Sequence, residues 1–130
     1  MDPKLKLIKK VPLFQGLSKR ELAQVSGLLD EIELPAGKTL TSEGESGREF
    51  VVLVEGTADV TQDGEVVNRL GPGDFLGEIA LVTGEPRTAT VTTQSPARLL
   101  VMNAASFRLL LHDAPGIKQR VVATAALRSS

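Results

Sequence analysis

One short stretch of the chain, residues 71–91, combines the residue types that bind anions. It carries four glycines and two prolines, so its backbone turns repeatedly instead of continuing as a plain strand or helix. Gly77 permits a close approach of the backbone, and residues 78–82 are long enough for about one helical turn. The first backbone N–H groups of such a turn have no partner within the helix. The stretch therefore offers hydrogen-bond donors to an anion.

Two charged residues extend this arrangement. Glu78 opens the turn, and Arg87 follows nine positions later, just before an alternating segment that is typical of a strand. A carboxylate accepts hydrogen bonds from ribose hydroxyls, whereas a guanidinium binds phosphate oxygens. Together the two residues could hold a ribose phosphate. Each alone is also an ordinary surface residue, a carboxylate near a helix N-terminus or an arginine at a strand start.

This stretch closely resembles the phosphate-binding cassette of cyclic nucleotide-binding domains. These domains are the regulatory modules of cAMP- and cGMP-dependent kinases, gated channels and catabolite-activator-type transcription factors. The resemblance covers residues 12–128. Residues 13–17 match a short sequence motif with which family members often begin. In the cassette it rests on ten residues at the family's spacing: Phe75, Gly77, Glu78, Ala80, Leu81, Gly84, Pro86, Arg87, Thr88 and Ala89.

The resemblance implies roles for individual cassette residues. Arg87 would pair with the exocyclic oxygens of the cyclic phosphate, and Glu78 would accept a hydrogen bond from the ribose 2′-hydroxyl. Gly77 and Ala80 would contribute small size and backbone donors. The expected ligand-binding set is Gly77, Glu78, Ile79, Ala80, Arg87, Thr88 and Ala89. Ile79, with Val54 and Leu70, could line the sugar and base pocket, although core packing alone also accounts for all three.

The residue after the arginine bears on the choice of nucleotide. In the family, threonine or serine at this place often accompanies cGMP binding, and alanine often accompanies cAMP selectivity in kinases. Bacterial members with serine or threonine nevertheless bind cAMP. One net hydrogen bond changes affinity by only about two- to twelvefold, so Thr88 does not identify the ligand by itself. We expect cAMP and leave cGMP open.

Composition argues against several other classes of protein. The 130 residues suit one domain. The net charge of −1 gives no global attraction to nucleic acid or to an anionic membrane. The chain has no cysteine and one histidine, His112, so it lacks a thiol nucleophile and the histidine–carboxylate cluster of a metal-binding cupin. We expect no catalytic residue, no metal and no cofactor, and hence no enzyme.

The same sequence shows no targeting or membrane signal. No apolar run approaches the roughly 18 residues of a spanning helix. Met1 is followed by Asp2 and Pro3 rather than by a basic segment and a long apolar run, so no signal peptide is evident. We therefore expect a cytoplasmic location.

Helical elements flank the cassette in the predicted fold. Ser18 with Glu21 three positions later forms a capping box, and apolar residues follow at helical spacing, which predicts an amphipathic helix over 18–29. Residues 4–10 fit either a helical turn or a loose arm. Near the other end, Asn103 can cap a helix that ends at His112, and a second helix restarts at 113–115 and ends near Arg128.

Between these helices the pattern is one of short strands. They are separated by glycine and proline turns, and Asp63-Gly64 is a strong hairpin signal. The predicted strands are 32–34, 38–42, 50–54, 58–61, 65–70, 88–93 and 97–102. This pattern indicates a barrel or jelly roll rather than a parallel α/β sheet. The resemblance implies an α+β, mainly β fold, an eight-stranded antiparallel jelly-roll barrel with the cassette inserted and with C-terminal hinge and lid helices.

We therefore expect one cyclic nucleotide-binding domain over residues 1–130. Its parts are an N-terminal helical part (1–30), a β-roll with the cassette at 71–91 (31–103) and C-terminal helices (104–130). The expected function is that of a regulatory sensor whose C-terminal helices transmit binding to an effector or partner protein outside this chain. The apolar stripe of the last helix suggests a homodimer. One alternative is a non-binding interaction or structural module of the same fold. Another is a DNA-binding regulator, but the nearly neutral net charge and the lack of a recognisable helix-turn-helix argue against it.

Overall fold

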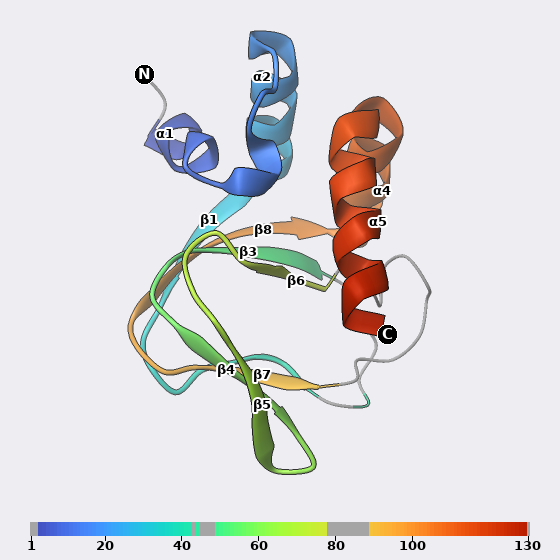
Figure 1. Ribbon diagram of the computed structural model, residues 1–130. Coiled ribbons are helices and arrows are strands. Elements are labelled where there is room, and N and C mark those ends of the chain that lie inside the picture. Colours follow the sequence, from blue (N-terminus) through green and yellow to red (C-terminus); the bar gives the residue numbers. More distant parts are fainter. Residues whose placement is uncertain (1–2, 43, 45–48, 78–88, 130) are drawn as a thin grey trace.

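The computed structural model describes residues 3–42, 44, 49–77 and 89–129 (Figure 1). The helices are α1 (Pro3–Lys9), α2 (Lys19–Leu28), α4 (Ala104–Asp113) and α5 (Pro115–Ser129), with a short 3-10 helix, η1 (Pro12–Phe14), after α1. The strands are β1 (Asp30–Leu34), β2 (Thr39–Thr41), β3 (Glu49–Glu55), β4 (Ala58–Gln62), β5 (Glu65–Leu70), β6 (Phe75–Leu76), β7 (Thr90–Thr93) and β8 (Ala97–Asn103).

The strands form two four-stranded antiparallel sheets. Their orders are β1-β8-β3-β6 and β2-β7-β4-β5. The predicted mainly β, antiparallel architecture with flanking helices is therefore confirmed. The predicted eight-stranded jelly-roll barrel is not closed, because no strand pair within the described residues joins one sheet to the other.

Strand β5, at the edge of the second sheet, shows one physical reason for the open arrangement. A bulge interrupts its pairing with β4 between Val60 and Thr61. On the same strand, the side-chain oxygen of Asn68 accepts the backbone N–H of Arg69 at 2.8 Å. Both features blunt a sheet edge, because they twist it and occupy a donor that a further strand would need.

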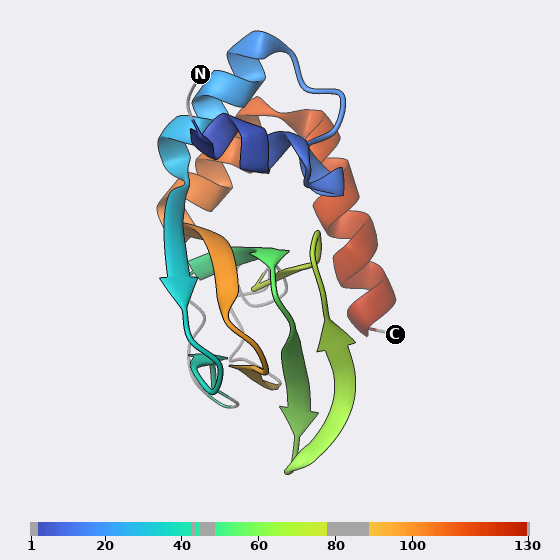
Figure 2. The same cartoon turned by 90° about the vertical axis from the view of Figure 1, so that its left-hand side faces the viewer.

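The central strands β3 and β8 are buried on both faces. Along β3, Phe50, Val52 and Val54 belong to the core under the helices, and Val51 and Leu53 belong to the core between the two sheets. This division follows from the two-residue period of a strand. It explains why the sequence of β3 is continuously apolar rather than alternating. Figures 1 and 2 show the helices on one side of the β1-β8-β3-β6 sheet and the second sheet on its other side.

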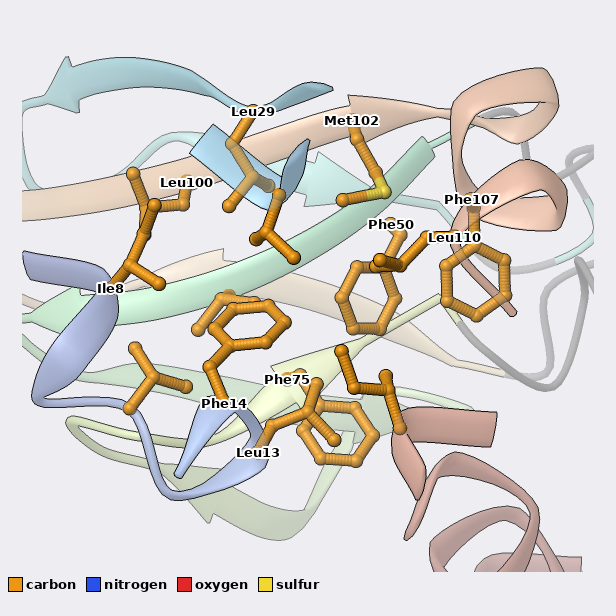
Figure 3. Close-up of a cluster of buried hydrophobic side chains, with 14 of the residues drawn as sticks. Ile8, Leu13, Phe14, Leu29, Phe50, Phe75, Leu100, Met102, Phe107 and Leu110 are labelled. Carbon is orange, nitrogen blue, oxygen red and sulfur yellow. The ribbon is translucent and has the colours of Figure 1, made fainter. Parts of the chain in front are cut away.

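The core under the helices is built largely from phenylalanine and leucine (Figure 3). The ring of Phe50, on β3, contacts Phe75 on β6, with centroids 5.5 Å apart, and Phe107 on α4, with centroids 4.5 Å apart. Leu13 and Phe14 of η1 enter the same cluster and are nearly fully buried. One continuous core thus holds N-terminal helices, the central strands and C-terminal helices together.

Local signals read from the sequence set the ends of the helices. The capping box is present, because Glu21 N–H donates to Ser18 Oγ at 3.1 Å and Ser18 N–H donates to Glu21 Oε1 at 3.0 Å. Asn103 Oδ1 accepts the N–H of Ser106 at 2.8 Å and begins α4. Residues 3–9 form a helix rather than a loose arm, held by a hydrogen bond from Lys4 Nζ to Leu29 O at 2.8 Å.

The strand and hairpin predictions also correspond closely to the structure, with one omission. Asp63 and Gly64 have φ angles of 52° and 82°, as the type I′ turn of a two-residue hairpin requires. The sequence did not predict β6, because a strand of two residues between Gly73 and Gly77 is too short to show a period.

Candidate functional site

The predicted cassette, residues 71–91, opens with a tight turn that is fixed to the central strand β3. Gly71 N–H donates to Asp74 Oδ2 at 2.8 Å, so the carboxylate closes the turn over residues 71–74. Gly73 N–H donates to Leu53 O at 2.7 Å, and Leu53 N–H donates to Asp74 O at 2.8 Å. Two bonds to the backbone of one central-strand residue define where the turn lies. The turn therefore sets the starting point of β6.

Gly77 directly follows β6. It lies at the end of the first sheet at which β8 passes into α4. β6 pairs with β3 through Val51↔Leu76 and Val52↔Phe75. Two residues before Val51 on β3, Glu49 pairs with Asn103, the cap residue of α4. Gly77 itself is buried and has a φ of 100°, a conformation that L side chains rarely adopt. The cassette therefore begins beside the point at which β8 passes into α4.

The other end of the cassette lies on the second sheet. Ala89 is half-buried and directly precedes β7, which pairs with β4 on one side and β2 on the other. Buried Thr93 ends β7. Its hydroxyl donates to Pro35 O and accepts the N–H of Lys38, both at 2.8 Å. Residues 77 and 89 are thus placed by different sheets, and the inner faces of these sheets meet at a shared core that contains Leu76 and Val91.

The predicted ligand-binding residues divide into two groups. Gly77 and Ala89 lie at the two ends just described. Glu78, Ile79, Ala80, Arg87 and Thr88 lie outside the described residues, so their contacts remain predictions. Of the other candidate pocket residues, Val54 packs in the core under the helices and Leu70 in the core between the sheets.

Two residues that position the cassette were not identified from the sequence: Asp74, which closes the turn, and Pro12, which packs against Gly73. Phe75, one of the ten residues that carry the resemblance, anchors β6 against Phe50. A Cβ added to Gly73, whose φ is 95°, would lie 3.1 Å from Pro12 Cδ. The Gly-Pro-Gly-Asp sequence does indicate a turn, and Asp74 could have been found from it. The contact with Pro12 crosses some sixty residues and has no local signal.

A separate depression of about 510 Å³ lies at the opposite end of β3 and β8. Its charged lining consists of Glu33, Glu55 and Arg98, and the guanidinium of Arg98 forms ion pairs with Glu33 at 2.9 Å and with Glu31 at 3.3 Å. Arg98 is shared among several glutamates, and these side chains are partly exposed, so the ion pairs stabilise only weakly. Within the described residues, no group of three or more histidine, cysteine or acidic side chains could hold a metal ion.

The pKa shifts resolved in the described part of the chain lie at helix ends rather than at the cassette. The backbone N–H and hydroxyl of Ser18 lower the pKa of Glu21. Hydrogen bonds from His112 and then from Gln24 lower the pKa of Asp113. Gln24 Nε2 donates to Asp113 Oδ2 at 2.7 Å, which ties α2 to the junction of α4 and α5. None of the helices the structure describes is both long and apolar enough to cross a membrane.

Comparison with known proteins identifies a family and relatives that this chain resembles. A family model described as "Cyclic nucleotide-binding domain" matches residues 31–114. The chain is 40% identical over 124 residues to a cAMP-dependent protein kinase regulatory subunit from Mycosarcoma maydis, a match that covers 88% of this chain and 24% of the relative. It is 38% identical over 113 residues to a cyclic nucleotide-gated potassium channel from Mesorhizobium japonicum, a match covering 87% and 31%.

A solved structure shows a similar arrangement in space. The regulatory domain of Toxoplasma gondii PKA, crystallised with cAMP, superposes with a TM-score of 0.73 at 32% identity, over 85% of this chain and 44% of that one. The chain spans less than a third of the length of the two curated relatives named above.

Proposed function

Because the chain belongs to the cyclic nucleotide-binding domain family, we propose that it is a sensor module that binds a cyclic purine nucleotide, with cAMP as the ligand. The observation that carries the proposal is the presence of Glu78 and Arg87 at the family's spacing. The segment that holds them begins at buried Gly77 and ends at Ala89, each fixed by a different sheet.

The two charged residues would act on different parts of the nucleotide. Arg87 would hold the phosphate through its guanidinium, which presents several donors in a fixed plane. Glu78 would accept the ribose 2′-hydroxyl and thereby disfavour 2′-deoxy analogues. Backbone N–H groups of the turn after Gly77 would complete the phosphate site, with small Ala80 leaving room for a close approach. The proposal assigns no catalytic residue.

Transmission of binding would begin where the cassette starts. Gly77 lies next to the end of the sheet at which β8 passes into α4, and Phe75, Phe50 and Phe107 connect β6 to that helix through ring contacts. A nucleotide that prefers one position of α4 and α5 would enrich that position. The effector that responds would lie outside these 130 residues, and residues 1–130 would act as one module because the core under the helices and the core between the sheets share strands β3 and β8.

Calorimetric titration of cAMP and cGMP into the purified chain tests the proposal. Arg87→Ala should weaken binding by about 30-fold to several-thousand-fold, because truncating a partner of a buried charge pair costs about 2–5 kcal/mol. Arg108→Ala is the matched control, since Arg108 is exposed on α4, and it should bind as the wild type does. If neither nucleotide gives heat or raises the melting temperature, the chain is instead a non-binding interaction module of the same fold.

The same titrations address specificity through Thr88. Thr88→Ala should change the ratio of cAMP to cGMP affinity by no more than about twelvefold, the effect of one net hydrogen bond. A larger change would show that the hydroxyl does more than form one contact with the ligand.

A homodimer through α5 also remains a prediction. Two apolar residues of this helix, Ile117 and Val121, are buried in the chain's own core, whereas Val122 is 46% exposed. Sedimentation over a concentration series would reveal the dimer, and a chain that stays monomeric throughout would exclude it.

A further inference from the structure

The short helix η1 contacts two segments that are far from it in sequence. One is α5, which would transmit binding, and the other is the turn over residues 71–74, which would position the cassette. Arg120, on α5, donates from Nη1 to the carbonyl oxygen of Leu13 at 2.7 Å, across 107 residues. One residue earlier, the ring of Pro12 packs against Gly73, in the turn with which the cassette begins. Adjacent residues of η1 thus meet both α5 and the turn.

The side of η1 that meets α5 is firmly anchored. Leu13 and Phe14 are only 4% and 1% exposed. On α5, Ile117 and Val121 are buried close to Arg120 in sequence. A carbonyl at the end of a 3-10 helix lacks a partner within the helix, and a guanidinium is a strong donor to it. Arg120 therefore fixes α5 to η1 with a directional bond in addition to apolar packing.

The side of η1 that meets the turn leaves little space. A Cβ at Gly73 would come within 3.1 Å of Pro12 Cδ, so the ring lies directly against the backbone of the turn. Behind it, the N–H of Gly73 is bonded to Leu53 O at 2.7 Å. The turn is held between Pro12 and β3, and a displacement of η1 would release one of its two supports.

We propose that Arg120 is a positioning residue that couples the position of α5 to the cassette through η1. Its bond to Leu13 holds Pro12 against Gly73, and this contact pre-organises the turn from which β6 and Gly77 follow. Loosening a pre-organised site lowers affinity. By the reciprocity of linked equilibria, a ligand that fixes the cassette strengthens the docking of α5. The part that concerns nucleotide rests on the function proposed above.

Hydrogen exchange on the ligand-free protein tests the coupling without any nucleotide. Arg120→Met keeps an unbranched apolar chain at a mainly exposed site but removes the donor. It should speed exchange of the amides of α5 and also of Gly73, whose N–H bonds to Leu53, by severalfold or more. Arg108→Met, the same change on exposed α4, should affect neither. Faster exchange in α5 with unchanged exchange at Gly73 would overturn the proposal.

Titration with cAMP tests the consequence for binding. Arg120→Met should bind about 2- to 30-fold more weakly than wild type, the range for residues that couple two sites without touching the ligand. Pro12→Ala should weaken binding in the same direction. Both changes break the same chain of contacts, from α5 through η1 to the turn. The double variant should therefore bind cAMP no more weakly than whichever single variant has the lower affinity.

Two results of the titration would contradict the proposal: wild-type affinity in Arg120→Met, or strictly additive losses in the double variant. A wild-type chain that binds neither cAMP nor cGMP would refute the proposed function. The exchange measurement would still decide whether η1 couples α5 to the turn.

Discussion

The ring of Phe50 stacks on the ring of Phe107, with centroids 4.5 Å apart and an angle of 23° between their planes (Figure 3). Phe50 lies on central strand β3 and Phe107 on α4, and both are almost fully buried. The stack therefore joins the sheet that carries the start of the cassette to the first of the C-terminal helices. It contributes both apolar burial and a preferred ring geometry.

Phe107→Ala should destabilise the fold by about 3–5 kcal/mol, because it removes a buried ring and leaves a cavity. The coupling between Phe50→Leu and Phe107→Leu in a double-mutant cycle should be about 0.5–1.5 kcal/mol. Urea denaturation measures both quantities. Leu109→Ala is a control on the same helix, since Leu109 is 49% exposed, and should change stability by less than about 0.5 kcal/mol. A Phe107→Ala variant as stable as this control would contradict the stabilising role of the contact between Phe50 and Phe107.

The elements with strong local chemistry were predictable from the sequence. The capping box at Ser18, the cap at Asn103 and the Asp63-Gly64 hairpin each depend on residues within a few positions of one another. The open arrangement of the two sheets was not predictable in this way. It depends on which strands pair across long separations and on edge features such as the bulge in β5, and these leave no periodic pattern in the sequence.

Two glycines should respond to alanine in opposite directions. Gly27 lies in α2 with open space around the position of a Cβ, so Gly27→Ala should stabilise by about 0.5–1 kcal/mol. Gly56 has a φ of 94°, and its Cβ would lie 2.5 Å from Pro96 O. Gly56→Ala should therefore destabilise by about 2–4 kcal/mol through backbone strain and steric overlap. Thermal melting of both variants provides the comparison, and shifts of the same sign would be inconsistent with it.

Stability should depend on pH through Glu21. Hydrogen bonds from Ser18 hold its folded-state pKa below the ordinary value of 4.5. A carboxyl group whose pKa is lowered on folding stabilises the fold above its unfolded-state pKa, and this contribution is lost as the pH falls through the folded-state value. Wild type should thus exceed Glu21→Gln in urea midpoint at pH 6, and the difference should shrink by pH 3.

Asp113 supplies the control for this pH dependence. Its pKa is lowered too, by His112 and Gln24, so it loses its contribution as the pH falls through its own lowered pKa. Asp113→Asn should leave the difference between wild type and Glu21→Gln at each pH unchanged, because the hydrogen bonds that lower the pKa of Glu21 come from Ser18 and those that lower the pKa of Asp113 come from His112 and Gln24. A difference that is constant between pH 3 and pH 6 would show that Glu21 acts only as a neutral cap.

The binding residues of the candidate site remain predictions, whereas part of its structural support is described. Residue types and spacing predict Glu78 and Arg87, since binding a ribose phosphate requires a carboxylate, a guanidinium and free N–H groups near one another; both lie outside the described residues. The supports come from contacts between distant segments, such as Pro12 with Gly73 and Leu13 with Arg120. No local pattern encodes which proline or arginine makes such a contact.

The hydroxyl of Thr93 should be essential for the position of β7 and hence of the cassette's second end. The side chain is 1% exposed, and its Oγ1 bonds to Pro35 O and to the N–H of Lys38 in the connection between β1 and β2. Thr93→Val has the same shape but leaves those two backbone groups unpaired. It should destabilise the fold by about 1–3 kcal/mol in urea denaturation.

Two further variants separate the hydroxyl from the shape of the side chain. Thr93→Ser keeps the hydroxyl and should therefore lose less stability than Thr93→Val. Thr92→Val changes the neighbouring residue, which points to the opposite face of β7 and is only half-buried, and should cost less than about 0.5 kcal/mol. If Thr93→Val were as stable as Thr92→Val, the two 2.8 Å bonds would contribute no net stability. Packing and the backbone hydrogen bonds of Thr93 with Gly37 and Lys38 would then hold β7 against the connection between β1 and β2.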